Sequence, residues 1–386
     1  MRTGMGQYPR SDQEGAGCID RRIVSARVKR EESNMLGKRF EYNGRSWLPL
    51  NQLQSELRAQ IEGKLKDGIY RFEDVPCCIC DGRDFEALST RDRYGLYMPV
   101  VICRQCGLIQ TNPRMTQESY SEFYNAEYLQ LYMGEEIPRP YFFASQLEKG
   151  RRIFAYLSTQ PLSKPLATMS VLEVGCGAGG ILHYFKQQGC SVQGIDLGAE
   201  NVAFGRERYG LNLSRGTIAD VRWDVPPDLI IYSHVLEHVL QPNNELQQVR
   251  RILPDDGVLY VELPGVKDVR KSCDREFLRY LQNAHTYHFT LTSLKNLLQR
   301  NGFELIAGSE SINSVFRKRK GEASPAIVND CPDAMSYLRS NEFRRKLRPP
   351  SASELNRWSR SAVLAALKTI GLDRAAKARY EAWKRR

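Results

Sequence analysis

The chain has 386 residues, which is enough for two or more domains with a substantial hydrophobic core. Its 41% hydrophobic and 10% aromatic content is typical of a soluble globular protein, and no apolar run approaches the ~18 residues of a membrane span. The N-terminus lacks the apolar segment of a signal peptide, so we expect a cytoplasmic protein whose ten cysteines are reduced. The formal net charge of +11 lies in residues 317–386, which carry 18 Lys and Arg against 7 Asp and Glu. The rest of the chain is balanced, so the charge describes a tail rather than an active site.

The first 74 residues are the least informative. Residues 1–20 are rich in small and polar side chains, which predicts an N-terminal extension that is partly disordered. Apolar side chains recur at helical spacing from Leu50 to Leu65 and predict one amphipathic helix.

Two Cys-x-x-Cys knuckles lie in residues 75–116, formed by Cys77 with Cys80 and by Cys103 with Cys106. Four thiolates at this spacing predict a zinc ribbon with a closed structural site, and residues 84–101 are expected to supply a hairpin. Cys78 is the spare cysteine of the first knuckle. An iron–sulfur cluster would use the same four ligands and is an alternative to zinc. A redox-active cysteine pair is disfavoured by the presence of two knuckles.

A helical connector is expected over residues 117–168. Tyr120, Tyr124 and Tyr128 fall on one helical face, and residues 141–157 predict a second helix. Packing at a domain junction is the simpler reading of the tyrosines. The alternative is that Tyr124 or Tyr128 reaches a cofactor or acceptor.

A glycine-rich turn lies at the centre of the chain. Residues 171–174 predict a buried strand and residues 180–188 a helix. Glycines permit tight turns and let a ligand touch bare backbone, and the helix N-terminus offers free N–H groups. The turn between strand and helix carries a carboxylate and three alternate glycines, which are Glu173, Gly175, Gly177 and Gly179.

A second predicted strand ends at Asp196, about 20 residues past the turn, where an adenosine ribose needs a hydroxyl acceptor. The carboxylate of Glu173 suits a cationic ligand better than the pyrophosphate of a dinucleotide. The alternative is an ordinary tight turn with Asp196 as a solvated acid. The coincidence of strand, turn, helix, strand and acid favours an adenosine-containing cofactor.

Strands and helices alternate through residues 169–316. This alternation predicts a doubly wound, Rossmann-like α/β domain with a seven-stranded parallel sheet. Ligands of such sheets lie at the carboxyl ends of the strands. Four residues are expected at that edge: Gly175, Asp196, Ile218 and His234.

Several motifs now stand in a defined order: the two knuckles, the tyrosine-rich helix, the Glu173–Gly179 turn, Leu236-Glu-His238, and His285-Thr-Tyr-His288. Together they resemble bacterial class I S-adenosylmethionine-dependent methyltransferases that carry an N-terminal zinc-binding domain. That group includes deoxysugar C-methyltransferases acting on nucleotide sugars. The resemblance covers about residues 76–316 and leaves the N-terminal extension and the tail unexplained.

The resemblance implies roles for individual residues. The carboxylate and the three glycines of the turn hold the methionine end of S-adenosylmethionine. Asp196 takes the ribose hydroxyls, and His234 lies beneath the sulfonium through its carbonyl. The implied cofactor-binding residues are Glu173, Gly175, Cys176, Gly177, Gly179, Asp196, Thr217, Ile218 and His234, and the implied metal ligands are Cys77, Cys80, Cys103 and Cys106.

The resemblance also suggests a catalytic base. In the sugar C-methyltransferases a histidine near His285 is the base and follows a tyrosine and a glutamate, but here the run is Gln282-Asn-Ala-His285. O-methylation of a hydroxyl is therefore the safer expectation, with His285 and His288 as the proton-transfer candidates. The alternative is that one or both of these histidines cap or pack the next helix in the chain. Glu237 and His238 are expected to play a structural role at a helix start.

Residues 317–386 predict a basic helical extension, either packed on the core or facing an anionic membrane or acidic partner. We expect a methyltransferase whose acceptor is a small molecule, such as an anionic sugar nucleotide. The alternatives are an RNA or protein methyltransferase and a non-catalytic cofactor-binding scaffold. Nucleic acid is disfavoured because the ribbon carries equal numbers of basic and acidic side chains.

Overall fold

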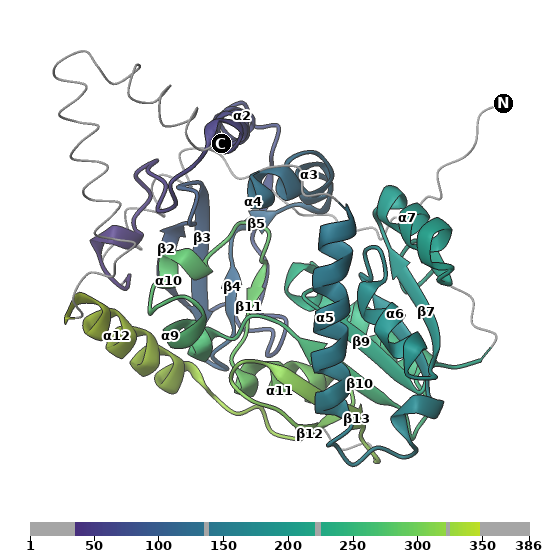
Figure 1. Cartoon of the computed structure of the whole chain (residues 1–386). Coiled ribbons are helices and arrows are strands. Elements are labelled where there is room, and N and C mark those ends of the chain that lie inside the picture. The colour runs from purple at the N-terminus through teal and green to yellow at the C-terminus, as the bar shows by residue number, and fades with distance from the viewer. Residues whose placement is uncertain (1–34, 135–138, 221–224, 322–324, 348–386) are drawn as a thin grey trace, which may run out of the picture. The chain divides into compact units, whose positions relative to one another are not determined.

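The computed structural model describes residues 35–134, 139–220, 225–321 and 325–347 (Figure 1). The chain divides into two compact units, Met1–Ser340 and Asn341–Arg386. The part of the predicted helical extension after residue 347 and the predicted disorder of residues 1–20 lie outside the described residues. Within the described ranges, no helix combines the length and apolar character that crossing a membrane requires.

The larger sheet has seven strands in the order β12-β13-β10-β9-β6-β7-β8. All pairs among β6 to β10 are parallel, whereas β13 runs antiparallel to both β10 and β12. The prediction of a wholly parallel sheet is therefore wrong for β13, because residues 308–312 are too short for a crossover and form a hairpin. The strands are β6 (Ser170–Val174), β7 (Ser191–Asp196), β8 (Leu213–Arg215), β9 (Leu229–Ser233), β10 (Val258–Glu262), β12 (Phe303–Ala307) and β13 (Asn313–Lys318).

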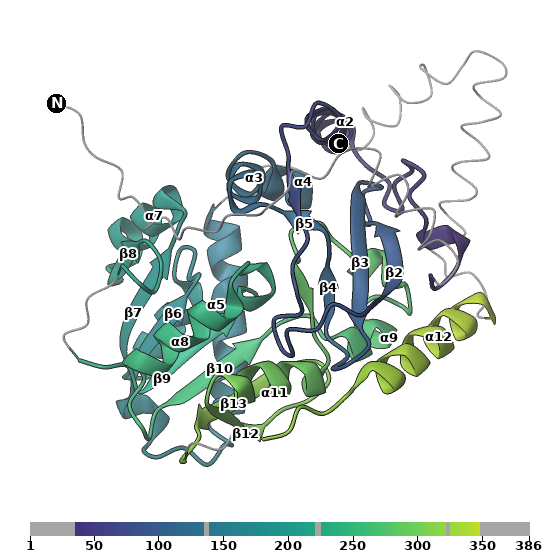
Figure 2. The same ribbon diagram turned by 180° about the vertical axis from the view of Figure 1, so that it is seen from behind.

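Helices cover both faces of this sheet. One face packs against α5, α6 and α7 (Figure 1), and the other packs against α8 and α11 (Figure 2). Each helix buries one apolar stripe against the strands, as the doubly wound prediction requires. The bounds are α5 (Arg139–Leu157), α6 (Gly180–Gln187), α7 (Ala199–Tyr209), α8 (Pro242–Ile252) and α11 (Leu291–Arg300).

The strand order reverses at β6, which lies between β7 and β9. A reversal of this kind opens a crevice at the carboxyl edge of a doubly wound sheet. The glycine turn after β6, Asp196 at the end of β7 and His234 after β9 all follow strand ends at that edge.

Helix α7 approaches the glycine turn very closely at Gly205. A Cβ atom there would lie 2.3 Å from the Ala178 carbonyl oxygen and 2.5 Å from Leu213. We expect Gly205→Ala to lower the free energy of unfolding by about 1–3 kcal/mol, because the backbone cannot yield without moving the turn. Urea denaturation measures this change. Gly63→Ala is the matched control, since nothing lies within 4 Å of the added atom; equal stability of the two variants would contradict the prediction.

A second, four-stranded sheet has the order β11-β4-β3-β2. The predicted hairpin between the knuckles is confirmed as β2 and β3, which pair antiparallel. Strand β11 comes from a distant part of the sequence and pairs with β4, so the knuckle region and the His285–His288 segment share one sheet. The strands are β2 (Phe85–Arg91), β3 (Tyr97–Cys103), β4 (Ile109–Thr111) and β11 (Tyr287–His288); a separate pair joins β1 (Phe72–Glu73) to β5 (Arg114–Met115).

The turn of the β2–β3 hairpin is organised by Asp92, which is fully buried. Its Oδ1 accepts the N–H groups of Tyr94 and Leu96 at 2.9 Å each. Burial raises the pKa of Asp92 to about 7, although these N–H groups oppose the shift. The folded protein therefore binds this proton more tightly than the unfolded chain does, and stability falls as pH rises from about 4 to about 7.

Asp92→Asn is expected to abolish this dependence, because an amide oxygen can accept the same N–H groups without a charge. Relative to wild type, the variant should gain about 2 kcal/mol of unfolding free energy between about pH 5 and about pH 8. Urea titrations across that range measure the difference. Parallel pH curves for the two proteins would contradict the assignment.

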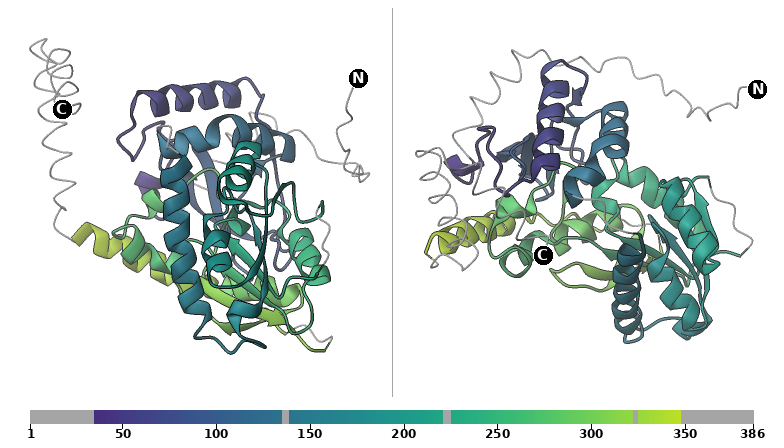
Figure 3. Two further views of the ribbon diagram at one scale, coloured as in Figure 1. Left: turned by 45° about the vertical axis from the view of Figure 1, so that its right-hand side comes forward. Right: turned by 45° about the horizontal axis from the view of Figure 1, so that its top comes forward.

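Helix α2 lies beside the tyrosine-rich helix (Figure 3). The predicted helix at Leu50–Leu65 is confirmed, and it begins at Gln52 because Asn51 forms a capping box with Gln54. The tyrosine-rich helix contains a π-helical turn, a feature often found at functional sites. The bounds are α2 (Gln52–Lys66), α3 (Gln117–Phe123), the π-turn η2 (Tyr124–Tyr128) and α4 (Leu129–Met133).

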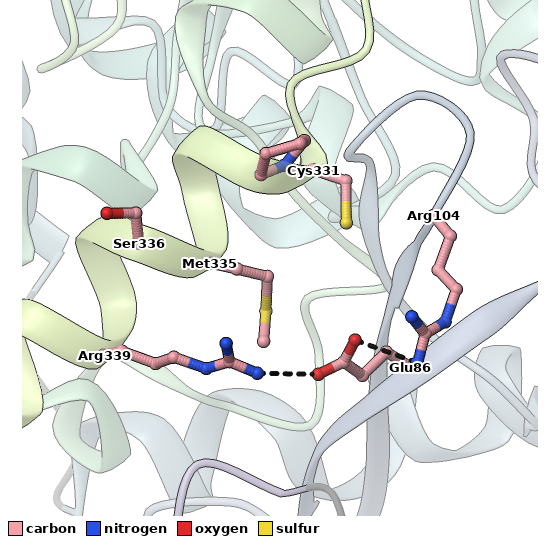
Figure 4. A pocket seen from close by; sticks show the side chains of 7 residues that line it. Glu86, Arg104, Cys331, Met335, Ser336 and Arg339 are labelled. Atoms are coloured by element: carbon pink, nitrogen blue, oxygen red, sulfur yellow. Dashed lines mark hydrogen bonds and ion pairs between the residues drawn. The ribbon is translucent and has the colours of Figure 1, made fainter.

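Helix α12 (Cys331–Leu347) was not predicted, and its first turns pack beside β2. There the carboxylate of Glu86 pairs with Arg104 at 3.0 Å and with Arg339 at 3.1 Å (Figure 4). Residues 317 and 318 belong to β13, so the basic run does not leave the core at Arg317 as the sequence suggested. The remaining short elements are η1 (Lys38–Phe40), η3 (Leu166–Thr168), η4 (Leu236–His238), η5 (Val266–Asp268), α9 (Val269–Ser272) and α10 (Phe277–Tyr280).

Candidate active site

The glycine turn adopts the backbone that its sequence predicted. Gly175, Gly177 and Gly179 have φ values of +70°, +54° and +79°, a region that side chains rarely allow. The Gly177 N–H donates to Asp196 Oδ2 at 2.8 Å, and the Gly198 N–H donates to Asp196 Oδ1 at 2.7 Å. Each carboxylate oxygen has a second lone pair, so Asp196 can still accept from ribose hydroxyls.

Glu173 is the strongest indication of a cationic ligand. Its side chain is buried, and among the described residues its Oε2 has no hydrogen-bond partner. Burial raises the pKa of this carboxyl well above its usual range. A buried carboxyl oxygen without a partner is costly, and the ammonium group of a methionine moiety would satisfy it. The residues therefore fit S-adenosylmethionine.

The other implied cofactor residues occupy different surroundings. The Cys176 side chain is buried, and Ile218 is buried in the core beneath the sheet edge. The Thr217 N–H and hydroxyl both donate to Asp220, which fixes the loop after β8. These positions are compatible with framing an adenine through backbone and apolar contacts.

The four knuckle cysteines converge on one point. The sulfurs of Cys77 and Cys106 lie 3.3 Å apart, those of Cys80 and Cys103 lie 3.5 Å apart, and all four lie within 4.8 Å of one another. A tetrahedral zinc ion with bonds of about 2.3 Å requires similar sulfur separations, so the thiolates fit zinc. Such a site would have no open position for chemistry. Cys78 lies outside this cluster.

A second polar cluster surrounds Glu237 in η4. The Glu237 side chain is 1% exposed, and among the described residues neither of its oxygens has a hydrogen-bond partner. Three histidine nitrogens approach its Oε1: His234 Nδ1 at 3.5 Å, His238 Nε2 at 3.9 Å and His285 Nε2 at 3.9 Å. We call these four residues the Glu237 cluster.

The charge state of the Glu237 cluster follows from its surroundings. Burial alone raises the pKa of Glu237, but His234 and His238 outweigh burial and hold it below its usual range. Burial, followed by the neighbouring histidines, lowers the pKa of His285 well below its usual range. At neutral pH the cluster therefore holds an ionised carboxylate beside a neutral His285.

The two catalytic candidates from the sequence lie in different positions. His285 belongs to the Glu237 cluster and contacts the Gln282 side chain through Nε2. His288 in β11 is 1% exposed and packs against the Tyr280 ring, with 5.5 Å between ring centroids. Burial lowers the pKa of His288 to about 3. Neither residue caps α11, because Thr290 supplies the cap.

The tyrosine face meets the Glu237 cluster. The rings of Tyr124 and Tyr128 stack at 4.8 Å, and both lie within 6 Å of the His238 ring. Burial, and then the charges of Asp196 and Glu237, raise the pKa of Tyr124 to about 12. Tyr124 therefore lies within electrostatic range of both Asp196 and the Glu237 cluster.

Sequence reasoning missed the position of Glu237. Glu237 and His238 were expected at the start of the helix after β9, but they form η4, a separate turn before α8. The Thr286 N–H donates to the Glu237 carbonyl at 2.9 Å and joins this turn to the His285 segment. The sequence did place these two residues shortly after a strand that ends at the carboxyl edge of the sheet, and that position could have indicated a functional role.

Comparisons with known proteins agree with this geometry. A profile of the methyltransferase domain matches residues 143–307. A ubiquinone biosynthesis O-methyltransferase of Pseudomonas paraeruginosa is 30% identical over 217 residues, covering 54% of this chain and 69% of that protein. An uncharacterized methyltransferase of Staphylococcus carnosus is 28% identical over 122 residues, covering 31% of this chain and 58% of that protein.

The chain matches only part of several relatives. A ubiquinone biosynthesis O-methyltransferase of Haemophilus ducreyi is 29% identical, and the match covers 28% of this chain and 50% of that protein. Among solved structures, the 1,6-didemethyltoxoflavin-N1-methyltransferase of Burkholderia thailandensis is 17% identical, with a TM-score of 0.40, and the match covers 57% of this chain and 98% of that one. The matched part spans about half the length of the first relatives.

The fold and the glycine turn define an α/β enzyme with an adenosyl cofactor. With the sequence matches added, the chain belongs to the class I S-adenosylmethionine-dependent methyltransferases.

Proposed function

We propose that this protein transfers a methyl group from S-adenosylmethionine to a hydroxyl of a small polar acceptor, such as a sugar or sugar nucleotide. Bound S-adenosylmethionine would supply an already activated methyl group. The chain must hold the acceptor in line with that group, exclude water and receive the hydroxyl proton. Glu173 and the glycine turn hold the methionine end, Asp196 the ribose, and Thr217 with Ile218 the adenine.

The observation that carries the proposal is the Glu237 cluster. A buried carboxylate, with no hydrogen bond to either oxygen among the described residues, lies beside three histidines at the carboxyl edge of the sheet. Buried polar atoms require partners, and a hydroxylated acceptor would provide several. One histidine of the cluster then takes the proton: His285, as the family resemblance implies, or His234, whose side chain is 41% exposed.

A second acceptor class is favoured by the tyrosine face. The stacked rings of Tyr124 and Tyr128 beside His238 would suit an aromatic hydroxyl, since aromatic rings stack favourably. The relatives named as ubiquinone biosynthesis O-methyltransferases are consistent with transfer to a hydroxyl oxygen in this alternative as well.

We also propose that the four knuckle cysteines bind a structural zinc ion within a ribbon at residues 75–116. That ribbon would support the acceptor site, because β11 completes its sheet. The methyltransferase domain would span residues 169–318, with the connector at 117–168 and a basic extension from residue 319 onward. A peripheral membrane or acidic partner for that extension, and a cytoplasmic location, complete the proposal.

Methyl transfer is tested with labelled S-adenosylmethionine and a host extract split into small-molecule and macromolecular fractions. We expect label in a small anionic metabolite. Label in an apolar phenol would favour the second acceptor class. Label in RNA or protein would overturn the small-molecule proposal.

A further inference from the structure

We propose that His234 and Glu237 form the base of the acceptor site: the His234 imidazole takes the acceptor's proton, and Glu237 positions that imidazole. This inference rests on the proposed function and names the residue that meets the acceptor hydroxyl. The family resemblance gives His234 a role only through its carbonyl and assigns the base to His285.

The backbone at His234 is held in an unusual conformation. Its φ is +57°, in the left-handed region, although it is not a glycine. Its N–H donates to the Glu262 carbonyl at 2.8 Å, which ties the residue to β10. A left-handed residue other than glycine costs roughly 1–2 kcal/mol, and such residues concentrate at functional sites. His234 adopts this conformation directly after β9, at the carboxyl edge of the sheet.

The side chain of His234 is accessible from outside the protein and also lies beside a carboxylate. It is 41% exposed, whereas the Glu237 side chain is 1% exposed. The 3.5 Å separation of His234 Nδ1 from Glu237 Oε1 is the shortest of the three histidine contacts in the cluster. A carboxylate beside Nδ1 favours the proton on that nitrogen and leaves the lone pair on Nε2. Nε2 is then the nitrogen that can accept a proton from outside the cluster.

His285 is less suited to this role. Its side chain is 6% exposed, and its Nε2 contacts the Gln282 amide. Arg93 Nη2 donates to Gln282 Oε1 at 2.5 Å. A guanidinium only donates, so the amide oxygen faces Arg93 and the amide N–H faces His285. The lone pair of His285 Nε2 is therefore occupied, and a buried donor holds this ring in place.

The proposed step balances in atoms and charge. The acceptor O–H bond breaks as its proton moves to His234 Nε2, and the oxygen electron pair forms the bond to the methyl carbon. The carbon–sulfur bond breaks with both electrons on sulfur, so the sulfonium becomes a thioether. The imidazolium that forms at His234 lies beside the Glu237 carboxylate, so its positive charge is compensated.

Other titratable groups near the pair do not supply this negative charge. Burial raises the pKa of the neighbouring tyrosines, and burial lowers the pKa of the neighbouring histidines, so both kinds are neutral at pH 7. Glu262 on β10 accepts from the Ser233 hydroxyl, and Asp196 accepts from two glycine N–H groups, so Glu237 is the carboxylate at ion-pair distance from His234. The groups around the pair are His238 in η4, His285 and His288 at β11, Tyr120, Tyr124 and Tyr128 on the tyrosine-rich helix, and Tyr280 on α10.

Nitrogen-15 NMR of the full chain labelled on histidine tests the pairing without an acceptor. The chain has five histidines, and His→Gln variants assign them. At about pH 8 we expect His234 to carry its proton on Nδ1. In Glu237→Leu the proton should move to Nε2, the form that free histidine favours, while His183 on α6 stays unchanged. Glu245→Gln, a half-buried carboxylate on α8 that accepts from Tyr232, is the matched control.

Kinetics with the acceptor fraction test the catalytic assignment. His234→Gln should lower the transfer rate at saturating cofactor at least about 100-fold. Glu237→Gln should move the acid limb of the rate–pH profile to lower pH by about one unit, which a purely structural role would not do. Both variants should bind S-adenosylhomocysteine within about threefold of wild type by calorimetry.

Three outcomes would overturn the assignment: an unchanged His234 tautomer in Glu237→Leu, a rate loss confined to His285→Gln, or a divalent metal ion lost from Glu237→Gln. The last result would make Glu237, His238 and His285 metal ligands, for which their spacing also suffices. The proposed function is tested separately from this assignment. A protein that binds S-adenosylhomocysteine but labels no acceptor would contradict the proposed function, whichever tautomer His234 adopts.

Discussion

Replacing Asp196 by alanine is expected to weaken the binding of S-adenosylhomocysteine about 100-fold, which corresponds to about 2.7 kcal/mol. The Asp196 carboxylate accepts the N–H groups of Gly177 and Gly198, and it would also accept the ribose hydroxyls. Its removal therefore loosens the glycine turn and removes the ribose contact together. Isothermal titration calorimetry with S-adenosylhomocysteine measures the affinity directly.

Asp228→Ala is the matched control for this experiment. Asp228 accepts the Ser170 N–H at 2.7 Å at the opposite, amino-terminal edge of the sheet. Its loss should lower thermal stability but leave cofactor affinity within about threefold of wild type. Unchanged affinity in Asp196→Ala would show that the cofactor does not lie against the end of β7.

Replacing Cys103 by serine is expected to remove the proposed zinc ion and to lower the free energy of unfolding by more than about 4 kcal/mol. Cys103 ends β3, and its sulfur lies in the buried four-cysteine cluster. Strand β4, next to β3, pairs with β11, so methyl transfer should fall as well. Metal analysis and thermal denaturation measure the two effects.

Cys190→Ser provides the matched control, because Cys190 is buried and its thiol donates to the Leu166 carbonyl outside the cluster. We expect the purified wild type and this control to hold about one zinc ion per chain. Wild-type protein that holds no metal and keeps its melting temperature after chelation would contradict the zinc proposal. An iron-containing chromophore would instead indicate a cluster on the same four thiolates.

Much of the α/β sheet could be predicted from the sequence, because neighbouring residues mark its strands and turns. The glycine turn and the end of β7 at Asp196 lie where the sequence predicted them, since glycines and a terminal acid mark both positions locally. The hairpin of β12 and β13 was misread, because strand direction depends on the length of a connection rather than on the composition of the strand. The tyrosine spacing predicted a helix but did not reveal its π-turn.

The surroundings of His285 could not be predicted from the order of residues alone. The sequence lacks the glutamate that would precede His285 in the resembling sugar methyltransferases, since Ala284 occupies that position. In the structure Tyr120 donates to the Ala284 carbonyl, and a carboxylate 3.9 Å from His285 comes from Glu237, almost 50 residues earlier. A partner that arrives from another segment leaves no spacing signal near His285.

Short spacings in the sequence predict the glycine turn, the acid that ends β7 and the pairing of the two cysteine knuckles, because a strand or tight turn converts each spacing directly into geometry. The pairing of β11 with the knuckle sheet and the position of Glu237 among three histidines depend on the tertiary structure. Those contacts join segments far apart in the chain, and they form because sheet pairing and burial of apolar surface are satisfied across the whole domain rather than within any one segment.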